Sequence, residues 1–213
     1  MLQSNKLKEK FENERSAFSE SHNIRIHRAI SWLKSAEDCE SNLDLQLVSL
    51  WIAFNACYGN PNDRIQAERQ NFSAFIAKLV HHDTEKRIYN LLWNHFSGPI
   101  LNLIDNRYLF KPFWDFHRGE IEDWRLAFEK SKIDATKMFS NFNVTGTLEV
   151  VLDRLYILRN QLVHGGATYK SKVNREQVKT GNNMLQLLIP VFIEIMMQNY
   201  QENWGEIYYP VVN

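Results

Sequence analysis

Cysteine is scarce in this chain, whose 213 residues include only Cys39 and Cys57. Neither belongs to a Cys-x-x-Cys pair or to a metal-ligand spacing, so the sequence holds no disulfide framework. At this length a domain buries a sufficient core without such cross-links. We therefore expect a protein of the reducing cytoplasm. A catalytic thiol is not favoured, because no basic or helix-terminal surroundings mark a lowered pKa.

Long apolar runs and an excess of charge of one sign are also missing. The N-terminus lacks the apolar core of a signal peptide. The longest apolar stretch, 184–197, is interrupted by Gln186, Pro190 and Glu194, which leaves it too short and too polar to span a bilayer. Lys plus Arg and Asp plus Glu each number 25, so no overall field attracts nucleic acid. The sequence predicts no membrane contact, and any contact with RNA must come from local patches.

Motifs for nucleotide cofactors, serine hydrolysis and metal binding are absent or weak. There is no GxGxxG, no P-loop and no GxSxG elbow. His81, His82 and Asp83, with His95 further on, form the best metal candidate. Adjacent histidines nevertheless point about 100° apart on a helix, and no His-x3-His spacing follows. We expect a solvated helix end there, with no metal and no cofactor.

What the chain does contain is a succession of segments with helical periodicity. No segment alternates apolar and polar residues for long enough to indicate a sheet, so the predicted class is all-α. A Ser41-Asn42 cap opens the strongly apolar helix 43–58, whose core face is formed by Leu47, Trp51, Phe54 and Tyr58. The other expected helices cover 2–20, 22–36, 147–164 and 174–200, with further helices within 62–145.

The helix that begins near Thr147 carries both an apolar face and a misplaced cation. Gly165-Gly166 supply a left-handed stop that ends it. The apolar residues are Leu148, Val151, Leu152, Leu155, Leu158 and Leu162, which recur at helical spacing. Arg159 projects into the same arc. Since a guanidinium keeps its charge, it must find an acceptor or line a wet cleft.

A polar stripe follows the same helix on a second face. It consists of Glu149, Asp153, Tyr156, Asn160 and His164, spaced three or four residues apart. Asn160 directly follows Arg159, and His164 comes five positions after Arg159, just before the glycine stop. The helix therefore ends in a pattern of arginine, a polar residue and histidine.

This Arg-x4-His arrangement resembles the ribonuclease motif of HEPN domains. The aromatic-rich stretch 50–58 also resembles the second bundle helix of HEPN proteins related to the ApeA anti-phage protein. HEPN domains are small, usually dimeric helical bundles. The resemblance implies a metal-independent endoribonuclease of the kind found in toxin–antitoxin, abortive-infection and CRISPR systems.

The resemblance covers about half the chain, 22–59 and 147–200. It implies one HEPN-like domain over 1–213, with those two ranges as the bundle core and 62–145 as a helical insertion. It also implies that RNA is the substrate, that the protein is a homodimer, and that an antitoxin or defence-system protein is a further partner.

The chemistry of RNA cleavage suits the residues of the motif. Histidine as a residue type can exchange protons near neutral pH, so His164 would act as general acid or base, while Arg159 offers a planar fork of donors to phosphate oxygens. Asn160 would orient the imidazole or bind phosphate. The substrate-binding candidates are Tyr156 on the same face and three cations past the helix: Lys170, Lys172 and Arg175.

Geometry favours a site shared between two chains. Five residues at about 100° each place Arg159 and His164 roughly 140° apart around a helix. Either the helix unwinds before His164, or a second copy supplies the missing group across a two-fold axis. Val150 and Ile157 are expected to be available for that contact.

Three alternatives remain open at the level of the sequence. Arg159 could bridge to Glu149, Asp153 or another carboxylate while His164 merely caps the helix. A non-catalytic module could bind RNA, a nucleotide or a protein, or the bundle could be purely structural.

The stretch 107–118 interleaves cations with aromatics, as single-strand binders do. An aromatic core of the insertion with basic residues at its surface is the favoured interpretation of that stretch.

Overall fold

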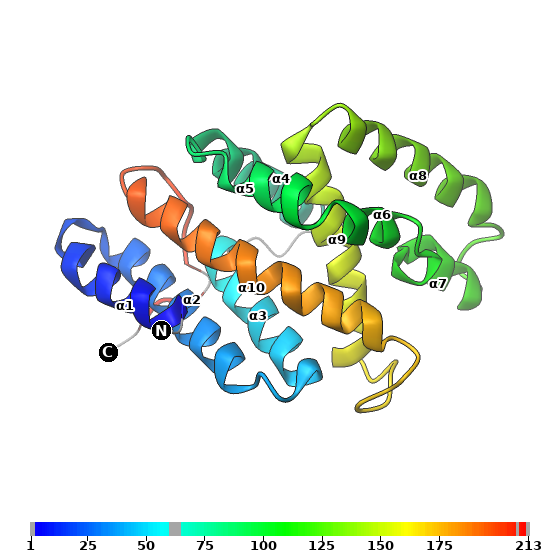
Figure 1. Ribbon diagram of the computed structural model, residues 1–213, viewed down its shortest axis with the longest axis horizontal. Coiled ribbons are helices and arrows are strands. Elements are labelled where there is room, and N and C mark those ends of the chain that lie inside the picture. Colours follow the sequence, from blue (N-terminus) through cyan, green and yellow to red (C-terminus); the bar gives the residue numbers. More distant parts are fainter. Residues whose placement is uncertain (1–2, 60–64, 208, 212–213) are drawn as a thin grey trace. The chain divides into compact units, whose positions relative to one another are not determined.

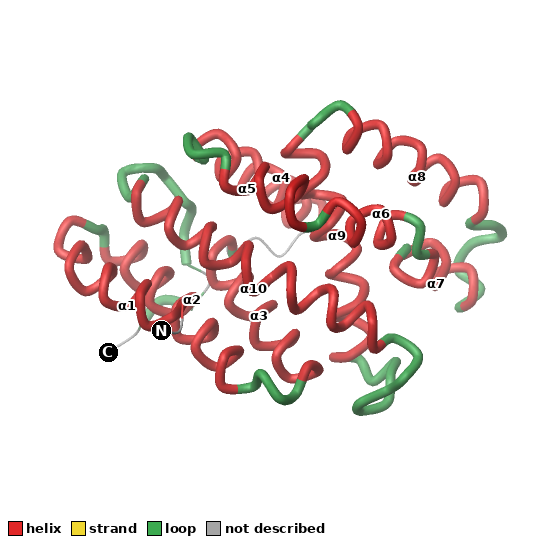
Figure 2. Tube along the Cα trace, in the orientation of Figure 1, coloured by secondary structure: helices red, strands yellow, loops and turns green. Residues whose placement is uncertain are grey.

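The computed structural model describes residues 3–59, 65–207 and 209–211, with side chains of 65–70 excepted. Every regular element in these ranges is a helix, which confirms the expected all-α class (Figure 2). None of the described helices combines the length and apolarity needed to cross a membrane. The chain forms two compact units: unit 1 comprises residues 1–87 and 181–213, and unit 2 comprises 88–180.

Unit 1 is a bundle built on an antiparallel helix pair. Its elements are α1 (Gln3–Glu14), η1 (Arg15–Ala17), α2 (Glu20–Asp38), α3 (Leu43–Tyr58), α4 (Ile65–His82) and the part of α10 (Arg175–Gln198) from Gly181 onward. The side chain of Ser19 caps α2, and the Asn42 side chain caps α3 by accepting from the Leu45 amide, as predicted. Residues 39–42 alone connect α2 to α3, so the two helices are neighbours (Figure 1).

Aromatic packing joins the helices of unit 1. The predicted core face of α3 is correct: Leu47, Trp51 and Phe54 are buried and Tyr58 is half-buried. The ring centroid of Phe54 lies 6.1 Å from that of Phe192 on α10. Each such ring removes about 150–250 Å² of surface from water, so these contacts dominate the stability of the bundle.

A buried arginine ties three segments of unit 1 together. Arg25, on α2, is 2 % exposed. Its Nη1 donates to the carbonyl oxygens of Cys57 (2.7 Å) and Gly59 (3.2 Å) at the end of α3, and its Nη2 donates to those of Gly205 (3.1 Å) and Glu206 (2.8 Å). The last carbonyls of a helix lack intrahelical donors and carry its negative dipole end, so a guanidinium suits them.

Replacing Arg25 by methionine is expected to destabilise the protein. The substitution keeps much of the side-chain length but leaves buried carbonyls without a donor, which lowers the free energy of unfolding by at least about 1–3 kcal/mol. Denaturation by urea, followed by circular dichroism, measures this. Arg28→Met, one turn further along α2, is the matched control and should stay within about 0.5 kcal/mol of the parent. Equal midpoints for the two variants would contradict the assignment.

Unit 2 consists of shorter helices around a second aromatic core. Its elements are α5 (Arg87–Asn90, starting at the boundary residue), the π-helical turn η2 (Leu91–His95), α6 (Ser97–Ile104), η3 (Arg107–Leu109), α7 (Lys111–His117), α8 (Arg125–Ser140), α9 (Val144–Val163) and the first turns of α10. Phe110, Phe113, Trp124 and Phe128 form a buried cluster. Phe110 and Phe113 of the 107–118 stretch therefore belong to a core, as the sequence favoured, and Trp114 and Phe116 pack against it. Tyr108 is exposed.

The compact units divide the chain differently from the expected bundle core and insertion. The insertion was expected over 62–145, of which 62–64 lie outside the described residues, whereas unit 2 spans 88–180. Helix α4 belongs to unit 1, and α9, which carries the motif, belongs to unit 2 with α6 and α8 packed against it. Contacts within unit 2 consequently decide which faces of α9 are covered.

Candidate functional site

Helix α9 buries most of the apolar face that its sequence predicts, although Leu162 is only partly buried, and it also buries Arg154 and Ile157. Leu148, Val151, Leu152, Leu155 and Leu158 are all buried. On the polar stripe, Asp153, Tyr156 and His164 are exposed, while Glu149 and Asn160 are partly exposed. The two faces are therefore assigned correctly, and the polar stripe is accessible to a ligand.

The end of α9 is regular up to the residue before His164. The helix runs through Val163, and the His164 amide still donates to the carbonyl of Asn160 (3.0 Å). Gly165 then adopts φ +69°, the left-handed stop that was predicted. His164 is exposed at this C-cap. The helix does not unwind between Arg159 and His164, and no described hydrogen bond joins their side chains.

Arg159 lies at the edge of the buried face with an amide as its partner. It is partly buried, and its Nη1 donates to Oδ1 of Asn160 at 2.9 Å. Within the described part of the chain it forms no ion pair with a carboxylate, so the anticipated bridge to Glu149 or Asp153 is not formed. The guanidinium is left with donors that an added anion could occupy.

Arg154, five residues earlier, is the buried arginine that the sequence analysis overlooked. Its Nη1 donates to the Leu109 carbonyl (3.3 Å), its Nη2 donates to Ser131 Oγ (3.0 Å), and its guanidinium lies 4.9 Å from the ring centroid of Phe110. Burial lowers its pKa from the ordinary value. These contacts fasten α9 to η3 and α8, so Arg154 is a structural residue.

The substrate-binding candidates are accessible but belong to different parts of the site. Tyr156 is 42 % exposed on α9. Lys170 and Lys172 are exposed in the loop after the helix, and the Lys170 ammonium lies 5.3 Å from the ring centroid of Tyr169. Arg175 is partly buried, and its Nε donates to the carbonyl of Ser171. Among the described residues, the side-chain hydrogen bond within the motif is that from Arg159 to Asn160.

Other titratable groups are poorly suited to chemistry near neutral pH. Burial raises the pKa of Cys57 to about 12. Burial, reinforced by the charge of Arg25, lowers the pKa of His22 to about 4. His82 contacts Glu202 at 3.1 Å, and no cluster of three or more metal-ligating side chains occurs among the described residues. His164 is an exposed histidine at the C-cap of α9, five residues after Arg159.

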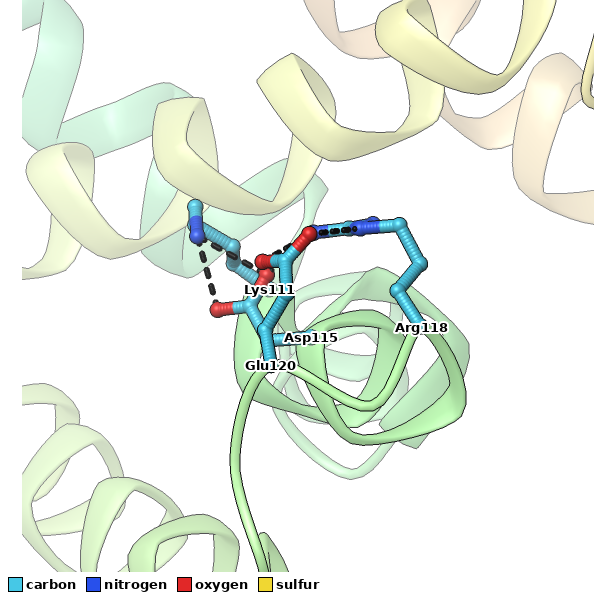
Figure 3. Close-up of polar contacts among 4 residues, drawn as sticks. All are labelled: Lys111, Asp115, Arg118 and Glu120. Carbon is cyan, nitrogen blue, oxygen red and sulfur yellow. Dashed lines mark hydrogen bonds and ion pairs between the residues drawn. The ribbon is translucent and has the colours of Figure 1, made fainter.

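Two cations of the 107–118 stretch are committed to carboxylates. Figure 3 shows Asp115 accepting from Lys111 on one side and from Arg118 on the other, with Glu120 also bonded to Arg118. Asp115 is largely buried, so the cluster neutralises a charge at the edge of the aromatic core. Lys111 and Arg118 are consequently unavailable as a phosphate-binding pair.

Comparison of the chain with protein-family models, with curated proteins and with solved structures finds no match. The likeness to HEPN domains therefore rests on the residues of α9 and α3 described above. The function is therefore inferred from the geometry at the end of α9.

His164→Ala is expected to leave the stability of the protein almost unchanged. The imidazole is exposed and the C-cap hydrogen bond uses the backbone amide, so the free energy of unfolding should shift by less than about 0.5 kcal/mol. Gly165→Ala is the comparison: a side chain in the left-handed region costs about 1–2 kcal/mol. Thermal melts of both variants measure the difference. A melting temperature of His164→Ala below that of Gly165→Ala would mean that His164 is structural.

Proposed function

We propose that the protein is a metal-independent endoribonuclease of HEPN type, with Arg159, Asn160 and His164 as its catalytic residues. The observation that carries the proposal is the state of Arg159: a partly buried guanidinium, with no carboxylate partner among the described residues, one helical turn before an exposed histidine. A cation at such a position is ready to bind a phosphate. A cellular role as a toxin or in defence against phage, in the cytoplasm, belongs to the same proposal.

RNA supplies its own nucleophile, which is why the reaction needs no metal. The 2′-hydroxyl attacks the adjacent phosphorus, the new P–O2′ bond forms, and the P–O5′ bond breaks. One proton leaves O2′ and another must reach O5′. His164 exchanges these protons, and Arg159 stabilises the extra negative charge on the phosphorane oxygens. Asn160 holds the guanidinium through Oδ1, and its amide NH₂ can donate to a phosphate oxygen.

The purified protein is expected to cleave tRNA or single-stranded RNA in the presence of EDTA. The products should carry 2′,3′-cyclic phosphate and 5′-hydroxyl ends, because the 2′-oxygen is the nucleophile. End-specific labelling and gel electrophoresis check both points, with Arg159→Ala and His164→Ala as inactive controls. Loss of cleavage on adding EDTA, with recovery on adding zinc or magnesium, would refute the metal-independent mechanism.

The site is proposed to be shared between two copies of the chain. Because α9 stays helical through Val163, Arg159 and His164 project roughly 140° apart, and one helix cannot aim both at a single phosphate. The expectation that Ile157 is available for this contact is wrong, because its side chain is buried, at 7 % exposed. Tyr156 and Val163, 42 % and 46 % exposed, are available instead for packing beside the motif.

Mixing Arg159→Ala and His164→Ala chains is expected to restore cleavage. Each variant alone is inactive, but after subunit exchange a mixed dimer keeps one site with both groups intact. Single-turnover cleavage of a labelled RNA measures the recovery. A site contained within one chain predicts that every mixture stays inactive. A monomer that cleaves RNA at all tested concentrations would eliminate the shared site.

A non-catalytic anion clamp is the second candidate, and one observation favours it. No described side chain hydrogen-bonds to the imidazole of His164, although a catalytic histidine is usually oriented by a partner. In this case Arg159 and Asn160 would bind an RNA phosphate without cleaving it. RNA affinity that depends on Arg159, without any cleavage, distinguishes the clamp from the nuclease.

A further inference from the structure

The stretch 107–118 leaves one arginine–tyrosine pair exposed on unit 2. Its buried rings belong to the core, and Lys111 and Arg118 are paired with carboxylates. Arg107 and Tyr108, in η3, are exposed. Arg107 Nη2 donates to the Tyr108 hydroxyl at 3.0 Å, and the guanidinium carbon lies 5.0 Å from the ring centroid. The pair therefore presents an aromatic ring and a planar cation side by side.

Arg107 is not neutralised by a carboxylate within the described ranges. Asp105, two residues earlier, pairs instead with Lys132. Arg125 also lies over aromatic rings of unit 2, but it pairs with Asp123. A guanidinium whose partners are rings and a hydroxyl keeps its full positive charge available to an anion.

Hydrogen bonds hold the Arg107–Tyr108 pair against one face of α9. Gln161 Nε2 donates to the Tyr108 carbonyl at 2.7 Å, and Trp114 Nε1 donates to the same oxygen at 2.8 Å. Three residues separate Gln161 from His164, so on a helix they project about 60° apart, as neighbours on one face. Arg159, two residues before Gln161, projects about 160° away from it. The pair therefore lies on the side of α9 that carries His164.

We infer that the Arg107–Tyr108 pair holds single-stranded RNA next to the scissile phosphate, on the chain that supplies His164. A base stacks on the Tyr108 ring and the guanidinium plane, and a phosphate of the same strand accepts from Arg107. Such contacts tolerate every base. The inference rests on the proposed ribonuclease function, for which it names the path of the substrate.

A single strand suits this surface better than a duplex. Tyr108 is 47 % exposed, and the pair lines an open hollow of about 360 Å³ beside η3, so an unstacked base has room at the ring. The bases of a duplex stay stacked inside it, and their faces cannot reach an aromatic side chain. We therefore expect the ring of Tyr108 to contribute to the binding of single strands and not of duplexes.

Binding is measured with the full-length His164→Ala protein, which cannot consume the probe. A fluorescein-labelled single-stranded RNA is titrated by anisotropy at several salt concentrations. Adding Tyr108→Ala should weaken binding about 5- to 150-fold, the effect of losing one stacked base. The bonds from Gln161 and Trp114 use the backbone oxygen of Tyr108, so they survive this change. The affinity for a duplex of the same length should not change.

Matched variants separate the ring from the charge. Arg107→Ala should weaken binding and reduce the slope of log affinity against log salt by about 0.7, the contribution of one phosphate contact on a single strand. Arg107→Lys keeps the charge and should restore the slope, and Tyr108→Phe keeps the ring and should bind like the parent. Arg125→Ala is the control, because its arginine is already paired with Asp123, and should change neither quantity.

Mixed dimers test on which chain the pair acts. Arg107→Ala is added either to the Arg159→Ala chain, which supplies His164, or to the His164→Ala chain, which supplies Arg159. At RNA concentrations below the Kd, restored cleavage should fall in the first mixture by the factor seen in binding and stay unchanged in the second. Equal cleavage in the two mixtures would overturn the placement of the pair beside His164.

The outcomes also distinguish this inference from the proposed function. Unchanged affinity in both Tyr108→Ala and Arg107→Ala overturns the inference, and RNA cleavage by the unmutated protein would then leave the nuclease intact. Binding of single-stranded RNA that depends on both residues, without any cleavage, would support this surface and refute the nuclease.

Discussion

A buried guanidinium cannot give up its charge, so it must be surrounded by acceptors or the fold fails. Each compact unit of this chain is organised around such a group. In unit 1, Arg25 gathers carbonyl oxygens from the end of α3 and from residues 205 and 206. In unit 2, Arg154 joins α9 to η3 and α8 while lying over the Phe110 ring. In both cases neutral oxygens take the place of a carboxylate: backbone carbonyls around Arg25, and one carbonyl with the Ser131 hydroxyl at Arg154. Several segments can therefore share one cation.

The proposed site also contains an arginine, but this guanidinium is not surrounded by buried oxygens. Arg159 sits on the same helix as Arg154, but its described hydrogen bond is to the Asn160 amide alone. An amide partner orients a guanidinium without neutralising it, so its positive potential stays available to an anion. Arg107 is similar, since its neighbours are aromatic rings and a hydroxyl. Arg154 therefore differs from Arg159 and Arg107 in that buried oxygens already accept from its guanidinium.

Much of α9 could be predicted from sequence because its signals are local. The repeat of leucines marks the buried face, and Gly165 is one of few residues that can adopt the left-handed stop. Arg154 and Ile157 could not be placed in the same way. Projected around the helix they fall outside the leucine arc, and only the packing of α6, α8 and η3 against that side buries them. A hollow beside η3 could not be predicted from the sequence either. Its lining includes Asn102, residues 105–108 and Gln177, which meet only through tertiary contacts.

The contacts of Arg25 also bear on the order in which the protein can be completed during synthesis. Its Nη2 partners lie 180 and 181 positions further along the chain. At a translation rate of about 5–20 residues per second, Arg25 is made roughly 10–40 s before those carbonyls exist. During that interval half of the guanidinium must remain hydrated, which keeps water at a place that is later dry. All of unit 2 is made in the meantime, so unit 1 is completed only after unit 2 has been translated.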